Sequence, residues 1–380
     1  MNTPHSFSKD QLTRYARHFA LPDFGIKGQQ RLKQSSVLVI GAGGLGAPVL
    51  MYLAAAGVGT IGIVDFDTID LTNLQRQVLY TTDQVGQSKV QLAAQRLRAI
   101  NPDCTIQVHD TALQRDNALE LFQPYDLIVD GTDNFPTRYL ANDAAVMLGK
   151  TYIYGSIYRY EGQVSVFNAL LPDGSRSINY RNLYPSPPHP DAVPNCAEGG
   201  VLGVLPGIIG SMQANEAIKV LAGVGRPLIG KLFLYDAATG ESRTIRIPPQ
   251  EPVAVLELID YQSFCSPADA FKPIPKLSSQ ELKEALQSSN PPFLIDVREP
   301  YERASDHIGG EHIPLGSIEE QAERLQGPSQ VVLYCQSGKR SAKAIRKLRD
   351  RFGFNHLINL EGGLAAYRQE TEGTAENGET

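Results

Sequence analysis

The sequence predicts an α/β fold in two domains, each built from strands that alternate with helices. The chain has 380 residues, which is more than one average domain. In its first half, short apolar runs alternate with segments of helical periodicity, a pattern typical of a mostly parallel sheet with helices on both faces. A second alternating unit follows an irregular, proline-bearing stretch. We therefore predict a first domain at 7–247, a linker at 248–275, a smaller α/β domain at 276–368 and a disordered tail at 369–380.

The composition is that of a soluble globular protein. Hydrophobic residues make up 42% of the chain, charged residues 20%, and the net charge is -6. Basic residues are not gathered into one run, so we expect no nucleic-acid partner. Gly and charged residues interrupt the longest apolar stretches, which argues against a transmembrane helix and a membrane partner. Residues 1–9 lack the apolar core of a signal peptide, so a cytoplasmic location is the default expectation.

The elements of the first domain follow from apolar runs and their periods. We expect strands at 36–40, 60–65, 104–109 and 127–130. Helical spacing predicts helices at 47–56, 88–100, 119–122 and 205–222. Five prolines between Tyr184 and Pro194 exclude a helix or a central strand there and predict a mobile surface crossover.

The second domain repeats the alternation on a smaller scale. We expect a helix at 278–287, strands at 293–297 and 331–334, a helix at 341–351 and a strand at 356–359. The sequence shows no internal repeat.

A glycine loop, Gly41-Ala-Gly-Gly-Leu-Gly46, follows the first strand. Gly41 allows a tight turn, Gly43 allows phosphate to approach the backbone, and Gly46 allows the helix to pack on the strand. The helix that follows offers free N–H groups to an anion. Asp65 ends the next strand, where a carboxylate can hold ribose hydroxyls. This pattern alone fits a nicotinamide oxidoreductase as well as an ATP-binding protein.

Polar residues after the loop favour ATP. Asn73, Arg76 and Lys89 supply an amide and two cations, which suit a triphosphate and its pyrophosphate leaving group. Asp133 and Asn134 follow the strand at 127–130, at the carboxyl edge where ligands bind in such sheets. A carboxylate at this edge can hold magnesium.

The four cysteines, Cys104, Cys196, Cys265 and Cys335, are widely spaced, and no two form a C-x-x-C pair. This spacing argues against a disulfide framework and against a four-cysteine zinc site. We expect Cys104, at the start of a strand, to be buried and inert.

Cys335 opens a short loop, Cys-Gln-Ser-Gly-Lys-Arg, between a strand and a helix. The loop N–H groups and the helix dipole are expected to point towards its sulfur, to lower the thiol pKa and to stabilise a persulfide. Only four residues separate Cys335 from Arg340, whereas tyrosine-phosphatase-like loops have five. The smaller ring suits a sulfur atom better than a phosphate group.

Taken together, the motifs of the first domain resemble the MoeB/ThiF group of ubiquitin-activating-like adenylyltransferases. The resemblance covers about Phe7 to Arg246 and rests on Arg14-Tyr-Ala-Arg17-His18, the glycine loop, Asp65-Phe-Asp67, Thr72-Asn-Leu-Gln-Arg76-Gln77, Lys89, Gly131-Thr-Asp133-Asn134, Tyr160-Glu-Gly-Gln163 and Cys196-Ala-Glu-Gly-Gly200. It implies a Rossmann-like mixed sheet that binds MgATP.

The same resemblance implies roles for individual residues. Asp65 would hold ribose, Asn73, Arg76 and Lys89 would hold phosphates, and Asp133 would bind magnesium. Arg17 would reach the γ-phosphate across a homodimer interface. The nucleotide site would be completed by Gly41, Gly43, Gly44, Gly46, Asp67 and Asn134.

The chain departs from many members of this group at their zinc site. Where two C-x-x-C pairs are usual, it has Asn179-Tyr-Arg-Asn182 and, near the second place, only Cys265. We therefore expect no structural zinc and a place in the zinc-free, MoeZ-like branch. In the group, the cysteine that matches Cys196 can meet the activated carrier or resolve an acyl disulfide, so Cys196 is a candidate catalytic residue.

The second domain resembles a rhodanese domain from about Lys276 to Arg368. The resemblance rests on Asp296-Val-Arg298-Glu299, His307-Ile-Gly-Gly310, Ile313-Pro314-Leu315, the Cys335 loop with Ser341, and Glu361-Gly-Gly-Leu364. We expect Asp296 and Arg298 to brace the fold as an ion pair.

The resemblances together imply an adenylyltransferase and sulfurtransferase. Its substrate would be a small β-grasp sulfur-carrier protein that ends in Gly-Gly, with molybdopterin synthesis as the expected pathway. Thiamine, cysteine and tRNA-thiolation carriers are alternatives, and the sulfur donor is either thiosulfate or a cysteine desulfurase persulfide. A nicotinamide oxidoreductase and a non-catalytic carrier scaffold are the rival functions.

Overall fold

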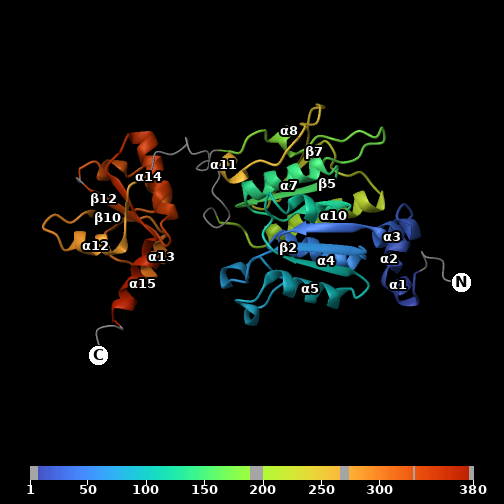
Figure 1. The fold of residues 1–380 in the computed structure, drawn as a ribbon, viewed down its shortest axis with the longest axis horizontal. Helices are drawn as coiled ribbons and strands as arrows, with labels where there is room; N and C mark the ends of the chain where they lie inside the picture. Colours follow the sequence, from blue (N-terminus) through green and yellow to red (C-terminus); the bar gives the residue numbers. More distant parts are fainter. Residues whose placement is uncertain (1–6, 189–199, 266–273, 328–329, 376–380) are drawn as a thin grey trace. The chain divides into compact units, whose positions relative to one another are not determined.

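The computed structural model describes residues 7–188, 200–265, 274–327 and 330–375. The chain divides into two compact units, Met1–Ser266 and Pro267–Thr380. Figure 1 labels many of the elements of both units, and each unit is described by itself below.

The first unit contains an eight-stranded mixed sheet in the order β3-β2-β1-β4-β5-β6-β7-β8. The first five of these strands are parallel, and β6 to β8 join antiparallel. The strands are β1 (Ser36–Ile40), β2 (Thr60–Asp65), β3 (Thr105–Asp110), β4 (Leu127–Asp130), β5 (Thr151–Tyr158), β6 (Glu161–Phe167), β7 (Lys231–Asp236) and β8 (Ser242–Arg246). The predicted α/β class with a mixed sheet is confirmed.

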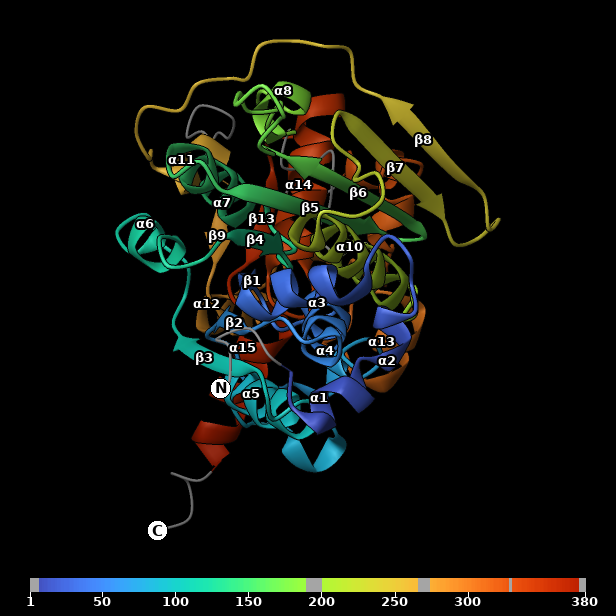
Figure 2. The same cartoon turned by 90° about the vertical axis from the view of Figure 1, so that its right-hand side faces the viewer.

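Helices cover both faces of this sheet, as Figure 2 shows. One face carries α3 (Gly25–Gln34), α4 (Gly46–Ala56), α5 (Lys89–Ile100) and α10 (Leu205–Ala222). The other carries α6 (Ala118–Phe122), α7 (Phe135–Met147), α8 (Tyr180–Leu183) and α11 (Tyr261–Cys265). Two short helices, α1 (Lys9–Arg14) and α2 (Ala16–Phe19), precede α3.

Strand β1 shows why the central strands are apolar throughout. Val37 and Val39 pack in the core beneath α4, whereas Leu38 and Ile40 pack in the core on the α7 side. A strand buried on both faces needs apolar side chains at every position, so its sequence shows no alternation. The predicted strand and helix ranges agree with the structure to within one or two residues at each end.

The segment expected to be a linker differs from the prediction. Residues 248–265 pack on the first unit, where Leu258, Tyr261 and Cys265 are buried in the core on the α7 side. The prolines near Pro248 predict an irregular stretch, and most of this stretch is irregular in the structure. The apolar residues at its end nevertheless fold back as α11, so the boundary between units falls at Ser266 instead of at 247.

The second unit is a five-stranded parallel sheet in the order β11-β10-β12-β13-β9. Its strands are β9 (Lys276–Leu277), β10 (Phe293–Asp296), β11 (Glu311–His312), β12 (Val331–Tyr334) and β13 (Leu357–Leu360). Helix α14 (Lys339–Phe352) covers one face, and α12 (Ser279–Leu286) and α15 (Gly363–Ala375) cover the other. Helix α13 (Pro300–Ser305) lies between β10 and β11 in the chain.

Two irregular segments were also predicted. Helix α15 continues to Ala375, so residues 369–375 are helical instead of disordered. The rest of that tail, most of the proline-rich crossover, and Cys196 lie outside the described residues.

Candidate adenylation and sulfur-transfer sites

The carboxyl ends of β1, β2 and β4 open into a cleft of about 510 Å³ in the first unit. Its walls bring together nine of the predicted site residues: Gly41, Gly43, Gly44, Asp65, Asp67, Arg76, Lys89, Asp133 and Asn134. They come from five separate stretches of sequence. A cleft at this edge of an open α/β sheet is the usual place for a nucleotide.

Two positions of the glycine loop, Gly41 and Gly46, are packed too tightly to accept a side chain. Gly41 has a φ of +87°, and a Cβ there would lie 2.9 Å from the carbonyl oxygen of Gly131. A Cβ on Gly46 would lie 1.9 Å from the Gly41 oxygen. Gly46 does not line the cleft, so its role is helix–strand packing, as its place in the motif suggested.

The acidic residues after β2 are held in place by the chain itself. The N–H groups of Ala42 and Asp67 donate to the Asp65 carboxylate at 2.7 and 2.9 Å. Burial raises the pKa of Asp65, and these two hydrogen bonds oppose the rise. Asp67 pairs with Lys89 at 2.9 Å, with the Lys89 side chain nearly buried. The carboxylates and the cation therefore form one fixed wall of the cleft.

Asp133 and Asn134 occupy different positions at the cleft mouth. Asp133 is exposed, and its carboxylate is accessible from the cleft. Asn134 caps α7, because its Oδ1 accepts the N–H of Thr137 at 2.9 Å. Of this pair, Asp133 is the side chain with a carboxylate to offer to a metal ion.

Besides Gly46, two predicted residues of the described first unit lie outside the cleft. Arg17 is exposed on α2, and it does not line the cleft of its own chain. Asn73 lies in a short 3-10 turn, Leu71–Asn73, where its Oδ1 accepts the N–H of Asp70 at 3.3 Å.

A buried ion pair lies beneath the cleft floor and was not predicted from the sequence. Asp130 is fully buried and accepts hydrogen bonds from Arg138 at 3.1 Å and from Tyr152 at 2.8 Å. Arg138 also donates to the carbonyl oxygen of Thr132 at 3.0 Å. The pair thereby fixes the loop that carries Asp133. Arg138 follows Asp130 by eight residues, at the start of α7, and nothing in a single sequence marks it as buried.

The cleft also contains residues that the motifs did not identify. Gln77 is 5% exposed, and its Oε1 accepts no hydrogen bond from the described part of the chain. Gln262 of α11 and the loop Thr111–Gln114 also line the cleft. Gln77 stands next to Arg76 in a quoted motif, so the sequence held a signal for it. Gln262 was missed because it falls within the predicted linker at 248–275.

Asn179 and Asn182, which stand where the family resemblance would place one C-x-x-C pair, belong to a polar cluster. The Asn179 and Asn182 side-chain amides donate to the carbonyl oxygens of Val253 and Glu251, both at 2.8 Å. Beside them, Arg181 donates to both oxygens of buried Asp143, at 2.8 and 2.7 Å. The Tyr261 hydroxyl of α11 donates to the same carboxylate at 2.7 Å. These contacts hold the segment 248–265 on the unit. In the described parts of the chain, no group of three or more His, Cys, Asp or Glu side chains is arranged to hold a metal ion.

In the second unit, Cys335 lies at the carboxyl end of β12 and is 1% exposed. The hydroxyl of Ser341 lies 3.5 Å from its sulfur. The N-terminus of α15 closes over the loop, because Leu364 and Ala365 donate their N–H groups to the carbonyl oxygens of Cys335 and Gln336, at 2.8 and 3.1 Å. The predicted strand–loop–helix placement of Cys335 is confirmed.

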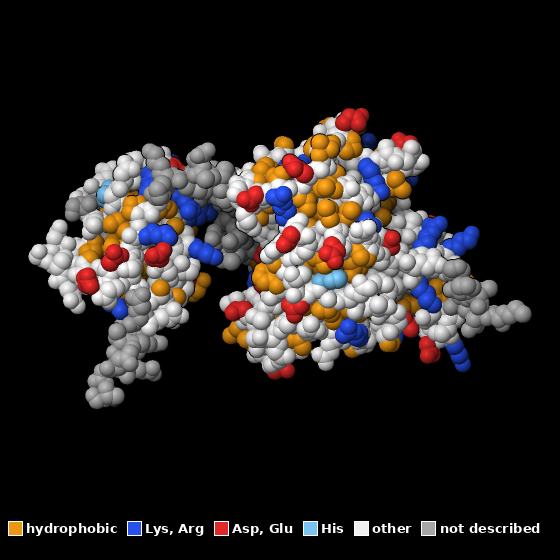
Figure 3. Space-filling view, in the orientation of Figure 1, with side chains coloured by type: hydrophobic (Ala, Val, Ile, Leu, Met, Phe, Trp, Pro, Cys, Tyr) orange, Lys and Arg blue, Asp and Glu red, His pale blue; other side chains and the backbone are white. Residues whose placement is uncertain are grey.

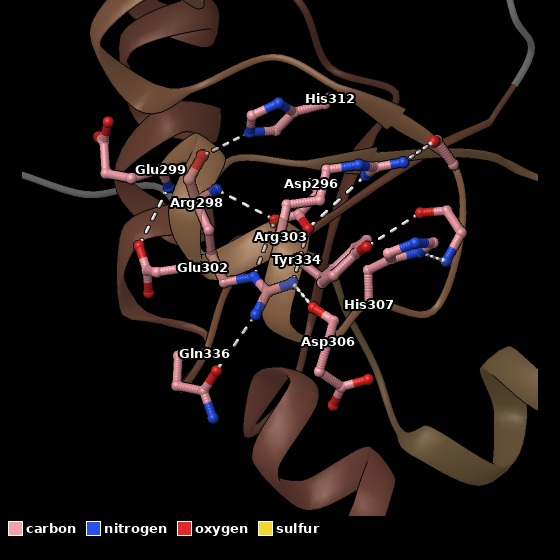
Figure 4. A network of polar contacts seen from close by, with 12 residues as sticks. Asp296, Arg298, Glu299, Glu302, Arg303, Asp306, His307, His312, Tyr334 and Gln336 are labelled. Carbon is pink, nitrogen blue, oxygen red and sulfur yellow. Dashed lines mark hydrogen bonds and ion pairs between the residues drawn. The ribbon is translucent and has the colours of Figure 1, made fainter.

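Figure 4 shows the network that supports this loop. Arg298 pairs with Asp296 through hydrogen bonds of 3.0 and 2.8 Å, so the expected ion pair is confirmed. Arg298 also reaches Gln336 of the loop at 3.4 Å. A second pair, Arg340 with Glu302 of α13, has two hydrogen bonds of 2.6 Å. No motif in the sequence marks Glu302 as a residue of this network.

The fold and these two sites define a two-unit α/β protein that joins a nucleotide-type cleft to a cysteine loop of the rhodanese kind. The chain belongs to the ThiF family, whose model matches residues 15–254, and the rhodanese-like domain model matches residues 278–370. Among the residues that the structure describes, no helix is long and apolar enough to cross a membrane.

Relatives with assigned names match both parts of the chain. The Mycobacterium tuberculosis protein named "Probable adenylyltransferase/sulfurtransferase MoeZ" is 48% identical over 97% of this chain and 95% of its own length. The Thermus thermophilus "Sulfur carrier protein adenylyltransferase" is 52% identical over 68% of this chain and 98% of its own length. The Caenorhabditis briggsae "Adenylyltransferase and sulfurtransferase MOCS3" is 41% identical over 94% of each chain. The prediction of a MoeZ-like enzyme is confirmed at this level.

Solved structures agree with the fold of the first unit. The crystal structure of Escherichia coli MccB with ATP matches 67% of this chain and 76% of its own, with a TM-score of 0.54 and 20% sequence identity. At that identity the likeness concerns the fold alone.

Proposed function

We propose that this chain adenylates the C-terminal carboxylate of a small β-grasp sulfur-carrier protein that ends in Gly-Gly, and then converts it to a thiocarboxylate. The observation that carries the proposal is the presence of both sites in one chain: a cleft with glycine-loop amides, cations and Asp133, and a cysteine loop capped by a helix N-terminus. The names of the relatives support the same pair of activities.

In the first step the carrier carboxylate attacks the α-phosphorus of ATP, and pyrophosphate leaves. Asp65 would hold the ribose, and Arg76 and Lys89 would compensate charge on the phosphates. Asp133 would bind magnesium, which normally takes one or two carboxylates together with phosphate oxygens. The unpaired Oε1 of Gln77 fits such a ligand, because it can accept from a metal-bound water or a peptide N–H. No general base is needed, since the carboxylate is already ionised.

In the second step the terminal sulfur of a persulfide on Cys335 attacks the acyl-adenylate carbonyl and AMP leaves. The product is an acyl disulfide. A thiolate, for which Cys196 is the candidate, attacks the Cys335 sulfur of that disulfide. The thiocarboxylate departs, a Cys335–Cys196 disulfide forms, and an external thiol reduces it. The proposed sulfur donor is thiosulfate or a cysteine desulfurase.

The finer assignments are part of the same proposal. Molybdopterin synthesis is the proposed pathway, which the MOCS3-named relatives support, and thiamine, cysteine or tRNA-thiolation carriers are the alternatives. A homodimer would bring Arg17 of one protomer to the γ-phosphate of the other. We also propose a cytoplasmic location and no structural zinc.

The test is ATP–pyrophosphate exchange with and without a Gly-Gly-ended carrier of the molybdopterin-synthase type. We expect exchange only when the carrier is present, followed by thiocarboxylate formation when a sulfur donor is added. Cys335→Ala should leave exchange intact and abolish the thiocarboxylate. An unchanged thiocarboxylate yield in that variant would refute the sulfur-transfer step, and no exchange with any carrier would leave only the scaffold alternative.

A further inference from the structure

Each guanidinium group near the Cys335 loop in the described part of the second unit is engaged by a carboxylate. Arg298 pairs with Asp296, and Arg340 pairs with Glu302. The Arg340–Glu302 pair is the closer of the two to the reacting thiol, because Arg340 belongs to the Cys335 loop. Arg340 also interacts electrostatically with the Cys335 thiol. Both side chains of the pair are about one-fifth exposed, at 21% and 19%.

The Arg340–Glu302 pair leaves little of the Arg340 charge for a ligand. Glu302 accepts from both terminal nitrogens, Nη1 and Nη2, at 2.6 Å each, which is the bidentate geometry that an anionic ligand would use. Arg340 lowers the pKa of Glu302 through these hydrogen bonds, so the carboxylate is charged at neutral pH. Glu302 therefore occupies the position in which an anion would bind Arg340.

Glu302 is fixed in this position by its own helix. It closes the capping box of α13, in which its Oε2 accepts the N–H of Glu299 at 3.0 Å. The carboxylate is thus placed by local structure in addition to its attraction to Arg340.

The basic residues around the Cys335 loop make the neutralisation of Arg340 by Glu302 significant. Helix α14 carries seven Lys and Arg residues and one Asp, and Figure 3 shows basic side chains gathered on part of the second unit. Such a helix, with its N-terminus at the cysteine loop, would favour highly charged anions. A carboxylate placed at the loop reduces that preference where the thiol reacts.

Sulfur donors differ in charge in a way that this carboxylate can distinguish. Thiosulfate is a dianion: the Cys335 thiolate attacks its outer sulfur, a Cys–S–S bond forms, the bond to the sulfonate sulfur breaks, and sulfite leaves with the electron pair. A thiol-borne persulfide transfers its outer sulfur in the same way and releases a thiolate. Cysteine persulfide carries a net single negative charge.

We propose that Glu302 is a selectivity residue of the sulfur-transfer site, which pairs Arg340 and thereby lowers the rate with dianionic donors relative to singly charged ones. The inference rests on the proposed role of Cys335 as the sulfur acceptor. It assigns the choice of donor class to a residue outside the cysteine loop.

The test compares thiosulfate with cysteine persulfide as donors to the full chain, with cyanide as the acceptor. Glu302→Gln keeps an acceptor for the Glu299 N–H and a hydrogen bond to Arg340 but removes the charge. We expect kcat/KM for thiosulfate to rise about tenfold, mainly through KM, and kcat/KM for cysteine persulfide to change by less than about twofold. High salt should reduce the gain.

Two further variants keep the result interpretable. Arg340→Gln leaves Glu302 unpaired and should lower kcat/KM for thiosulfate more than for cysteine persulfide. In the double variant the gain from Glu302→Gln should vanish. Glu319→Gln is the matched control, because Glu319 pairs with Lys347 and Arg351 near the other end of α14. It should not change the ratio of the two donors.

The outcomes distinguish a failure of the Glu302 proposal from a failure of the proposed role of Cys335. If Cys335→Ala keeps sulfur transfer from both donors, the proposed role of Cys335 fails. If transfer depends on Cys335 but the donor ratio is the same in wild type, Glu302→Gln and Arg340→Gln, the selectivity role is overturned and Glu302 only supports the loop.

Discussion

At the scale of single residues, the nucleotide cleft is mostly preset by contacts within the chain. Backbone N–H groups already hold the Asp65 carboxylate, and Asp67 already holds Lys89. Asp133 differs, because it is exposed and projects from a loop whose floor is fixed by Asp130 and Arg138. Its side chain can therefore engage a ligand without first breaking a structural contact.

Asp133→Ala should abolish carrier-dependent ATP–pyrophosphate exchange, with a loss of at least about 100-fold in kcat, because a metal-binding carboxylate stabilises charge that develops in transfer. The fold should not change, since the side chain is exposed. Exchange kinetics and the melting temperature check the two expectations. Asp83→Ala, an exposed aspartate outside the cleft, is the control. Exchange near the wild-type rate in Asp133→Ala would contradict the metal assignment.

Cys104 and Cys265, the two cysteines that the structure describes in the first unit, lead to a prediction about pH. Burial raises the pKa of Cys104 and of Cys265 to about 11. Since the thiolate is the reactive form, both should resist iodoacetamide at pH 7.5 and react only as the pH approaches 11 or on unfolding. Mass spectrometry of the alkylated native and denatured chains measures this. Rapid labelling of either residue in the native chain at pH 7.5 would show that it is not buried as described.

At the scale of elements, the sequence was most informative where one segment decides its own structure. The apolar runs of β1, β2 and β4 and the glycine loop placed the cleft correctly, because strand burial and tight turns are local properties. It was least informative where distant segments meet. Helix α11 packs on α7 and reaches the cleft with Gln262, and that contact depends on Asp143 and Arg181, more than 75 residues earlier in the chain.

Asp143→Asn should destabilise the first unit by about 3 kcal/mol, since it leaves the Arg181 charge without its buried partner. The contacts to Tyr261 weaken as well, so the segment 248–265 should become sensitive to limited proteolysis. Chemical denaturation and a protease time course provide the measurements. Glu241→Gln removes an exposed pair with Arg243 and should cost less than about 0.5 kcal/mol. Equal effects of the two substitutions would show that the buried cluster does not hold α11.

At the scale of the whole molecule, the chain consists of two units with separate cores. The match to the Thermus thermophilus adenylyltransferase spans 98% of that protein with 68% of this chain, so a protein of about the length of the first unit exists by itself. The boundary at Ser266 is consistent with that length. The motifs of the sequence predict both domains, but the prolines after residue 247 predict a linker and so place the boundary too early.

Residues 1–265 alone should catalyse carrier-dependent pyrophosphate exchange within about twofold of the full chain, since a domain with its own core generally folds and functions alone. They should form no thiocarboxylate. Adding residues 266–380 as a separate chain at about 10 micromolar should restore the thiocarboxylate about 100-fold more slowly, because linkage supplies an effective concentration near millimolar. Equal rates for the linked and separate units would mean that the connection has no kinetic role.

The polar cluster around Asn179 and Asn182 has a consequence for the chemical environment that the protein tolerates. Sulfide competes with thiolates for zinc, and sulfane sulfur reacts with the thiolates themselves, so a unit stabilised by zinc–thiolate bonds would be exposed to the reagent that its neighbour carries. Here the contacts that hold the segment 248–265 come from the amides of Asn179 and Asn182, the Asp143 carboxylate, the Arg181 guanidinium and the Tyr261 hydroxyl. None of these groups reacts with sulfur nucleophiles or persulfides. The described part of the adenylating unit should therefore tolerate sulfide concentrations that would strip a zinc–thiolate site.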